Sequence, residues 1–413
     1  MARPASKTTA KAAAQKRGTR RRYTKADHTD FEHTGPDTLA GRYMRLFWQP
    51  VFISEDLQAG QALPIRIMNE DFTLYRGEGG KPHVVDARCP HRGSVLNTGW
   101  VVGETIRCLY HGWRFDATGQ CVEMPAEDAN FSHKVKIGGY PTEEYLGLIF
   151  VYFGEGVAPS LPRYAEFEGE GVLDVNVYTR LCNYFQNVEN NVDPAHTPFT
   201  HSQSSYVDQG LVGLPEVNGH ESEWGIAQLS KRPNGGLRIS HHGQPTILNL
   251  KFQPTDDESG WKELITWRVP VDDNYHKAFL VYFVHITGAK AERYRQRMVE
   301  RKTALAALPL AAELAQAVIR GELSVRDKAV LGRPDYLEIQ DHVAQQGQGV
   351  FADRRRERLG RTDMLVILLR KIWAREMKAL AEGKPLKQWH RPPEISPTIG
   401  IPGAKLVPET EEA

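Results

Sequence analysis

Cysteine is scarce in this chain of 413 residues, which contains only four. So few cysteines exclude a disulfide scaffold for a protein of this size and favour a reducing compartment, so we expect a cytoplasmic protein. Long apolar runs are also missing, because the longest aliphatic stretch near the C-terminus, residues 364–369, falls far short of the ~20 residues of a membrane span. No charge is in excess either, since 52 Lys and Arg face 51 Asp and Glu. We therefore expect neither a membrane nor nucleic acid as a partner.

What the chain does contain divides it into four parts. The first 25 residues hold nine basic and no acidic side chains, which is typical of a solvated extension. Alternating apolar residues at 62–76 and 82–89 predict strands, whereas apolar residues at three- and four-residue steps predict a helix over 363–381. Six prolines after residue 382 indicate an extended arm. We predict a basic tail, a strand-rich domain, a larger mixed domain and a proline-rich arm at residues 1–25, 42–155, 156–382 and 383–413.

Two short motifs in the strand-rich part each place a cysteine beside a histidine. Cys89 and His91 belong to Cys-Pro-His-Arg-Gly, and Cys108 and His111 belong to Cys-Leu-Tyr-His-Gly-Trp. The glycine after each histidine allows a tight loop whose backbone amides approach a bound metal. Two Cys and two His can hold structural zinc, but zinc fingers usually group the cysteines together and the histidines together. One Cys and one His in each loop instead match a Rieske [2Fe–2S] centre, which we favour over zinc.

A second group of candidate ligands lies further along the chain. Asp193, His196 and His201 follow the pattern Asp-x2-His-x4-His. On a straight helix, five residues would separate the two histidines by about 140° around the axis, which is poor for a shared ligand. Pro194 and Pro198 offer a reason for the helix to break and bring them together. The alternative is that Asp193 is a helix N-cap and the histidines are ordinary polar residues at a helix end.

Together these motifs resemble those of the Rieske non-haem iron ring-hydroxylating oxygenases, in the branch of phthalate dioxygenase and aromatic O-demethylases. The resemblance runs from about residue 43 to residue 373 and includes Trp-Arg-Val-Pro-Val-Asp-Asp from Trp267. It implies an α+β fold, in which an all-β Rieske domain precedes a catalytic domain of antiparallel sheet covered by helices (helix-grip type). It also implies a mononuclear Fe(II) and a Rieske [2Fe–2S] cluster, the cluster being held by Cys89, His91, Cys108 and His111.

By the same resemblance, His196 and His201 are ligands of the mononuclear iron. The family takes its third ligand from far downstream, and the Gln-Asp pair there makes Asp341 our choice over the nearer Asp193. Asp193 is instead expected to be a catalytic bridge that passes electrons to His196 from the Rieske histidine of a neighbouring subunit, for which His111 is the match. The alternative for Asp341 is a solvated carboxylate on a helix surface.

The resemblance and the missing motifs also predict partners. One Rieske centre stores one electron, whereas dioxygen activation takes two from outside, and the sequence contains no nicotinamide or flavin motif. We therefore expect a flavin and iron–sulfur reductase, with or without a ferredoxin, that draws on NADH. Arg92, Arg107 and Arg114 are candidates to dock an acidic electron donor, although solvated loop residues explain each one as well. The family implies a head-to-tail homotrimer.

The expected reaction is hydroxylation or O-/N-demethylation of an aromatic substrate, with a carboxylate anticipated on the ring. Arg232 and Arg238 are candidates to bind that carboxylate, although a surface hairpin explains them equally well. Cys121 and Cys182 are expected to be small buried hydrophobic residues. Two other functions stay open: a zinc-dependent hydrolase with a structural Cys2His2 site, and a Rieske electron carrier without catalysis.

Overall fold

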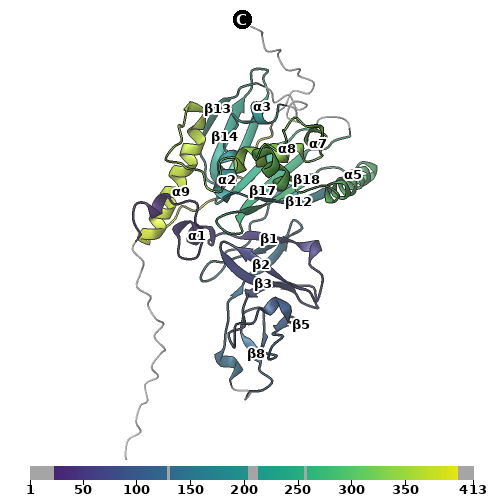
Figure 1. The fold of residues 1–413 in the computed structure, drawn as a ribbon, viewed down its shortest axis with the longest axis vertical. Coiled ribbons are helices and arrows are strands. Elements are labelled where there is room, and N and C mark those ends of the chain that lie inside the picture. The colour runs from purple at the N-terminus through teal and green to yellow at the C-terminus, as the bar shows by residue number, and fades with distance from the viewer. Residues whose placement is uncertain (1–22, 128–130, 203–212, 255–257, 399–413) are drawn as a thin grey trace, which may run out of the picture.

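The structure is a computed structural model that describes residues 23–127, 131–202, 213–254 and 258–398 (Figure 1). Most of the expected basic tail and the last part of the proline-rich arm lie outside the described residues. The described chain combines antiparallel sheets with helices, and the α+β fold class is confirmed. Figure 1 shows an elongated molecule, with small strands at one end and a larger sheet-and-helix body at the other.

The N-terminal end is built from three small antiparallel sheets. The first contains β1 (Gln49–Ile53), β11 (Leu148–Val151) and β10 (Thr142–Tyr145) in that order. The second contains β2 (Ala62–Ile67), β3 (Glu70–Arg76), β4 (Pro82–Asp86) and β9 (Gly139–Tyr140). The third contains β5 (Trp100–Val102), β6 (Thr105–Arg107), β7 (Arg114–Phe115) and β8 (Cys121–Glu123).

The larger body contains one antiparallel sheet of seven strands. Its longest strands pair side by side, and in β17 and β18 the side chains on both faces are mostly buried, as a sheet covered on both sides requires. In sheet order the strands are β12 (Val172–Arg180), β18 (His276–Val284), β17 (Lys262–Pro270), β16 (Ile247–Phe252), β15 (Leu237–Gly243), β14 (Gly225–Lys231) and β13 (Glu216–Glu221).

Helices cover one face of this sheet (Figure 1). Three of these helices are α2 (Tyr184–Asn191), α8 (Tyr336–Gln346) and α9 (Met364–Glu382). The predicted helix over 363–381 is α9, whose Trp373 packs edge-on against Phe185 of α2. The others are α1 (Leu39–Met44), α3 (Thr197–Thr200), α5 (Gly288–Ala306), α6 (Ala311–Ile319) and α7 (Lys328–Leu331). Short 3-10 turns are Asp27–Thr29, Ser54–Asp56, Leu96–Thr98, Ser132–Lys134, Ala165–Phe167 and Arg361–Asp363.

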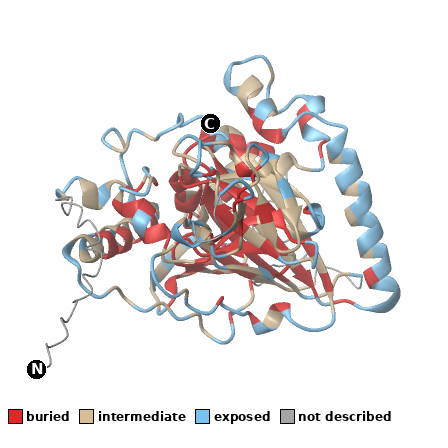
Figure 2. Ribbon diagram, turned by 90° about the horizontal axis from the view of Figure 1, so that it is seen from below, coloured by how far each residue is buried: buried red, intermediate tan, exposed pale blue. Residues whose placement is uncertain are grey.

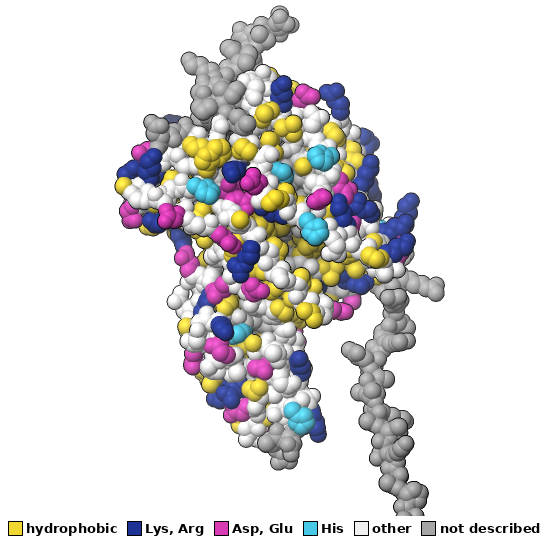
Figure 3. Space-filling view, turned by 180° about the vertical axis from the view of Figure 1, so that it is seen from behind, with side chains coloured by type: hydrophobic (Ala, Val, Ile, Leu, Met, Phe, Trp, Pro, Cys, Tyr) yellow, Lys and Arg dark blue, Asp and Glu magenta, His cyan; other side chains and the backbone are white. Residues whose placement is uncertain are grey.

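Burial is concentrated in the large sheet and the helices directly on it, whereas α5 stands out from the body and is exposed along most of its length (Figure 2). The opposite face of the sheet packs on the small-strand end, where the ring of Trp267 lies 5.4 Å from that of Phe150. Acidic and basic side chains are interspersed over the face shown in Figure 3. No single described helix is long and apolar enough to cross a membrane, although α5 and α6 together, bent by 48°, would be.

Candidate metal centres

Two similar loops at the far end of the small sheets hold the Cys-His motifs. In the first, the amide of Cys89 donates to the carbonyl of Ser94 and the amide of Gly93 donates back to Cys89, at 2.8 and 2.9 Å. The second repeats this pattern, since Cys108 bonds Trp113 at 2.8 Å and Gly112 bonds Cys108 at 3.1 Å. Gly93 and Gly112 have φ values of 76° and 75°, which a residue with a side chain rarely adopts. The tight loops predicted from these glycines are therefore present.

The four candidate cluster ligands differ in exposure: the cysteines are buried and the histidines are not. Cys89 and Cys108 are buried, whereas His91 is exposed and His111 is half-buried, with the two imidazoles 4.3 Å apart. The indole of Trp113 stacks on His91 at 4.5 Å and fixes its plane. Burial is the main reason that the pKa of the Cys89 thiol rises to about 11, so metal binding must displace its proton.

Two of the three arginines near these loops form ion pairs with a neighbouring glutamate. Arg107 and Arg114 both pair with Glu123, at 3.1 and 2.8 Å. Arg92 is exposed and lies over the ring of Tyr110 at 5.3 Å. Of the three arginines considered for docking an electron donor, only Arg92 therefore makes no ion pair among the described residues.

A break in the helix after α2 brings the second pair of histidines together. The chain leaves α2 at Asn191 and forms the single turn α3, with His196 as its N-cap residue and His201 as its C-cap residue. The two rings lie 5.4 Å apart at 76°. Because the helix is not straight, the angular separation of 140° does not apply. Asp193 is not the N-cap of α3, because that position is His196, although its side chain accepts a bond from the amide of Ala195 at 2.8 Å.

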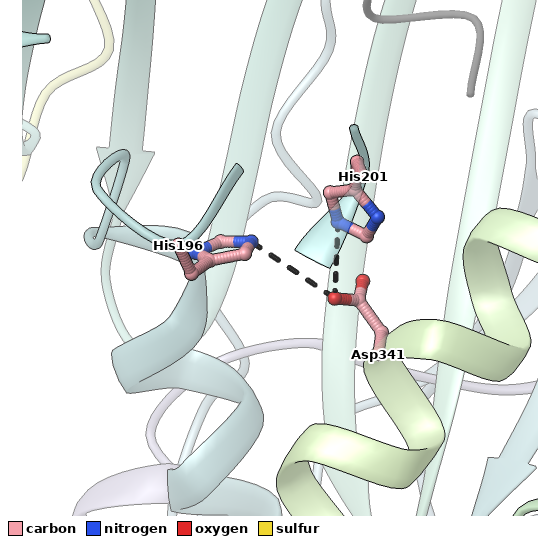
Figure 4. Close-up of side chains that lie close together, drawn as sticks. All are labelled: His196, His201 and Asp341. Carbon is pink, nitrogen blue, oxygen red and sulfur yellow. Dashed lines mark ion pairs between the residues drawn. The ribbon is translucent and has the colours of Figure 1, made fainter. Parts of the chain in front are cut away.

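The three predicted iron ligands converge beside the large sheet (Figure 4). Oδ1 of Asp341, on α8, lies 3.9 Å from Nε2 of His196 and 3.2 Å from Nε2 of His201. One donor atom from each residue can be taken so that all lie within 4.8 Å of one another. Two imidazole nitrogens and one carboxylate oxygen at this spacing fit a single metal ion. The 2-His-1-carboxylate donor set is that of non-haem Fe(II) oxygenases.

Neighbouring side chains lie close to Nδ1 of both histidines. Nδ1 of His201 lies 3.1 Å from the amide oxygen of Gln340, which can only accept, so Nδ1 carries the proton and Nε2 is left for a metal. Nδ1 of His196 lies 3.5 Å from Oδ2 of Asp193 but makes no hydrogen bond among the described residues. Both imidazoles nevertheless present Nε2 to Oδ1 of Asp341.

The electrostatics of the site favour an ionised Asp341. Burial alone would raise the pKa of this carboxyl, but the adjacent His201 and the guanidinium of Arg180 outweigh burial and hold the pKa well below its usual range. The pKa of Asp193 is likewise lowered, because its contact with His196 outweighs burial. Asp341 is therefore not a solvated surface carboxylate, and it is ready to bind a cation.

The two arginines considered for the substrate lie on the hairpin between β14 and β15, as one interpretation expected, but they are not at the surface. Arg232 and Arg238 are buried. Arg232 donates to the hydroxyl of Thr197 at 2.7 Å and to the carbonyl of Pro194 at 3.4 Å, and so clasps the segment that carries His196. Cys121 and Cys182 are buried, as expected.

The sequence interpretation missed three side chains that complete the site. Gln340 binds His201, and Arg180 and Arg268 are buried where α8 and α2 meet the sheet. Gln340 had a signal, since it precedes the expected ligand Asp341. Arg268 lies within the Trp-Arg-Val-Pro-Val-Asp-Asp motif from Trp267, which indicated the family but not the site, and Arg180 had no signal.

The chain is similar to several known proteins. The family model described as the Rieske [2Fe-2S] domain matches residues 47–142. The chain is 28% identical to the 5,5'-dehydrodivanillate O-demethylase oxygenase subunit of Sphingobium sp., over 89% of this chain and 84% of that protein. It is 36% identical to the 3-chlorobenzoate-3,4-dioxygenase oxygenase subunit of Comamonas testosteroni, over 65% of this chain and 64% of that protein.

A solved structure supports the fold. NdmB of Pseudomonas putida CBB5 superposes with a TM-score of 0.64 at 20% identity, covering 82% of this chain and 93% of NdmB. The predicted domain boundaries stay predictions. The cofactors of the chain are a Rieske [2Fe–2S] cluster and a mononuclear iron, as its Rieske domain and its oxygenase relatives imply. The chain belongs to the Rieske non-haem iron oxygenases and is a terminal oxygenase of the aromatic demethylase and dioxygenase type.

Proposed function

We propose that this oxygenase hydroxylates or demethylates an aromatic acid with dioxygen and electrons from a separate reductase. The observation that carries the proposal is the convergence of His196, His201 and Asp341 on one point, where Gln340 holds Nδ1 of His201 and leaves its Nε2 as the donor atom. A carrier of electrons alone would have no use for such a site, and a hydrolytic zinc site does not call for a Rieske domain in the same chain.

The two metal centres have separate ligands in this proposal. Cys89 and Cys108 bind one iron of the cluster, and His91 and His111 bind the other. His196, His201 and Asp341 hold the mononuclear iron, which, when bound, supplies the activation of dioxygen. The exposure of His91 and the partial exposure of His111 support an electron exit at the protein surface.

Asp193 supports electron entry to the catalytic site. Its Oδ2 faces Nδ1 of His196, its Oδ1 accepts from the amide of Ala195, and 28% of its side chain remains exposed. An exposed carboxylate edge can accept a hydrogen bond from a Rieske histidine of another copy. Within one chain the cluster loops lie at the opposite end of the molecule from α3 and α8 (Figure 1), so a head-to-tail homotrimer is part of the proposal.

Electrons come from outside the chain in this proposal. A reductase with flavin and an iron–sulfur cluster, with or without a ferredoxin, would draw them from NADH and pass them to the exposed face of the Rieske loops. Arg92 lies on that face.

A substrate screen tests the proposal. Aromatic acids and methoxy-aromatic acids are offered to the holoenzyme with a surrogate reductase, and substrate-dependent oxygen uptake is measured together with product. Asp193→Asn is expected to keep both metals and lose at least 90% of turnover. Normal coupled turnover in Asp193→Asn would contradict the bridging role, and metal analysis that finds zinc in place of iron would contradict the proposed reaction.

A further inference from the structure

Two buried guanidinium groups lie beside the proposed iron site with most of their donors unused. Arg180 on β12 is 1% exposed and Arg268 on β17 is 5% exposed. Among the described residues, Nη1 and Nη2 of Arg180 and Nε and Nη1 of Arg268 have no hydrogen-bond partner. An unpaired buried donor costs about 1–3 kcal/mol, and more when it is charged. A native fold that keeps four such nitrogens in one place indicates a ligand for them.

The bonds that the two groups do make fix them next to the proposed iron ligands. Nε of Arg180 lies 3.4 Å from Nδ1 of His342, the residue after Asp341 on α8. Nη2 of Arg268 donates to the side-chain oxygen of Asn191 at 3.0 Å, two residues before Asp193. Arg180 and Arg268 therefore connect the sheet to the two segments that carry the site.

Neither guanidinium forms an ion pair with a described carboxylate, although Glu338 and Asp341 both act on Arg180 electrostatically. No described carboxylate oxygen lies within the 4.0 Å of an ion pair to either guanidinium, although ion pairs are formed throughout the rest of the structure. Asp341 is close enough to act on both groups electrostatically, but its oxygen is directed at the two histidines. Burial lowers the pKa of Arg268, which reflects the penalty of removing its charge from water.

Apolar side chains continue the same face of the sheet. Residues opposite each other in antiparallel strands point to the same side, so Leu280 and Leu248 flank Thr266, which is two residues before Arg268. The next row places Leu264 between Leu250 and Tyr282. Leu248, Leu250 and Leu264 form one buried apolar cluster. An apolar surface therefore lies directly beside the cationic pair.

We propose that Arg180 and Arg268 bind the carboxylate of the aromatic substrate, while its ring lies on the leucines of β16, β17 and β18. This inference rests on the proposed function and assigns the anionic anchor to these residues. The free end of the Arg180 guanidinium presents two parallel donors, the geometry that matches a carboxylate. Arg232 is excluded from this role by its bonds to Thr197 and Pro194.

Binding of matched acids and amides tests the assignment. Benzoate, phthalate and 4-phenylbenzoate, each with its neutral amide, are titrated into anaerobic holoprotein by calorimetry. At least one acid is expected to bind tenfold or more tightly than its amide. Arg180→Met and Arg268→Met are expected to weaken binding of that acid at least tenfold and to leave the amide unchanged. Arg295→Met, which removes the same charge from exposed α5, is the matched control and should bind like wild type.

Metal content separates this inference from the proposed function. Iron and the Rieske spectrum are measured on every sample before titration. If both are present and no acid binds more tightly than its amide, or if both Met variants bind the acid like wild type, the anchor is wrong while the oxygenase assignment stands. If Arg180→Met does not fold, Arg180→Lys keeps the charge but not the two parallel donors, and it should still weaken acid binding at least threefold; wild-type affinity would overturn the assignment.

Discussion

Gln340 provides a direct test of how the protein prepares the iron site. Its amide oxygen lies 3.1 Å from Nδ1 of His201, and both side chains are buried. Gln340→Leu keeps most of the volume but removes the acceptor. His201 then loses the contact that holds its proton on Nδ1 and its Nε2 toward Asp341. Iron affinity should fall, while the Rieske cluster at the other end of the molecule should be unaffected.

The size of the effect follows from the lost contact. Leaving a buried N–H without its acceptor costs about 1–3 kcal/mol. Without a metal, His201 can turn or change tautomer and so avoid part of this cost. The metal-bound state cannot, so the cost lowers the affinity for iron. Loss of such a supporting contact typically weakens metal binding by about 10–100-fold. We expect Gln340→Leu to lie in this range.

Two control variants make the experiment specific. Gln340→Glu keeps an acceptor oxygen at the same place and should bind iron within about threefold of wild type, a shift well below that expected for a lost contact. Gln345→Leu makes the same chemical change on the same helix, at a buried side chain that has no hydrogen-bond partner in the described structure. Fe(II) affinity is measured anaerobically by chelator competition on protein that retains its cluster. Wild-type affinity in Gln340→Leu, or an equal loss in Gln345→Leu, would refute the reasoning.

Three further predictions concern stability. Glu189 is buried in ion pairs with Arg354 and Arg370, so Glu189→Gln should lower the free energy of unfolding by about 3 kcal/mol in denaturant titration; a loss under 0.5 kcal/mol would count against it. Burial raises the pKa of Glu263 from 4.5 to about 7, so between these pH values the folded state keeps a proton that the unfolded state has lost. The free energy of unfolding should therefore fall by about 3 kcal/mol as the pH rises from 5 to 8. Glu263→Gln should remove that slope, and an unchanged slope would show that Glu263 is not its source. Gly112→Ala, at φ 75°, should destabilise its loop by about 1–2 kcal/mol and lower the temperature at which the Rieske absorbance is lost.

The local parts of the site were predictable from the sequence. The Cys-His loops and the broken helix around Pro194 depend on glycine and proline, whose backbone effects act over a few residues, and the structure contains both. The long helix α9 also follows its periodic pattern. Asp341 was different, because no local rule connects a residue on α8 with His201. Only the family resemblance pointed to it, and the structure brings the two within 3.2 Å.

Other features depend on contacts between distant segments. Residues 62–76 read as one alternating run but form two strands, with a turn at Met68 and Asn69, both at positive φ. Asn69 is of a type common at positive φ, but Met68 is not. Their amides donate to the carbonyls of Pro270 and Val271 at the end of β17. The burial of Arg232 likewise arises from its contacts with the segment of His196. Sequence periodicity carries no information about these partners.

Iron content measured together with the Rieske spectrum is the most direct test of whether the chain binds both a Rieske cluster and a mononuclear iron. We expect about three irons per chain in the anaerobically reconstituted wild type, two in the cluster and one mononuclear. His201→Ala is expected to retain about two, with an unchanged Rieske signal in electron paramagnetic resonance. Zinc instead of iron, two irons in the wild type, or no loss of iron in His201→Ala would contradict the account.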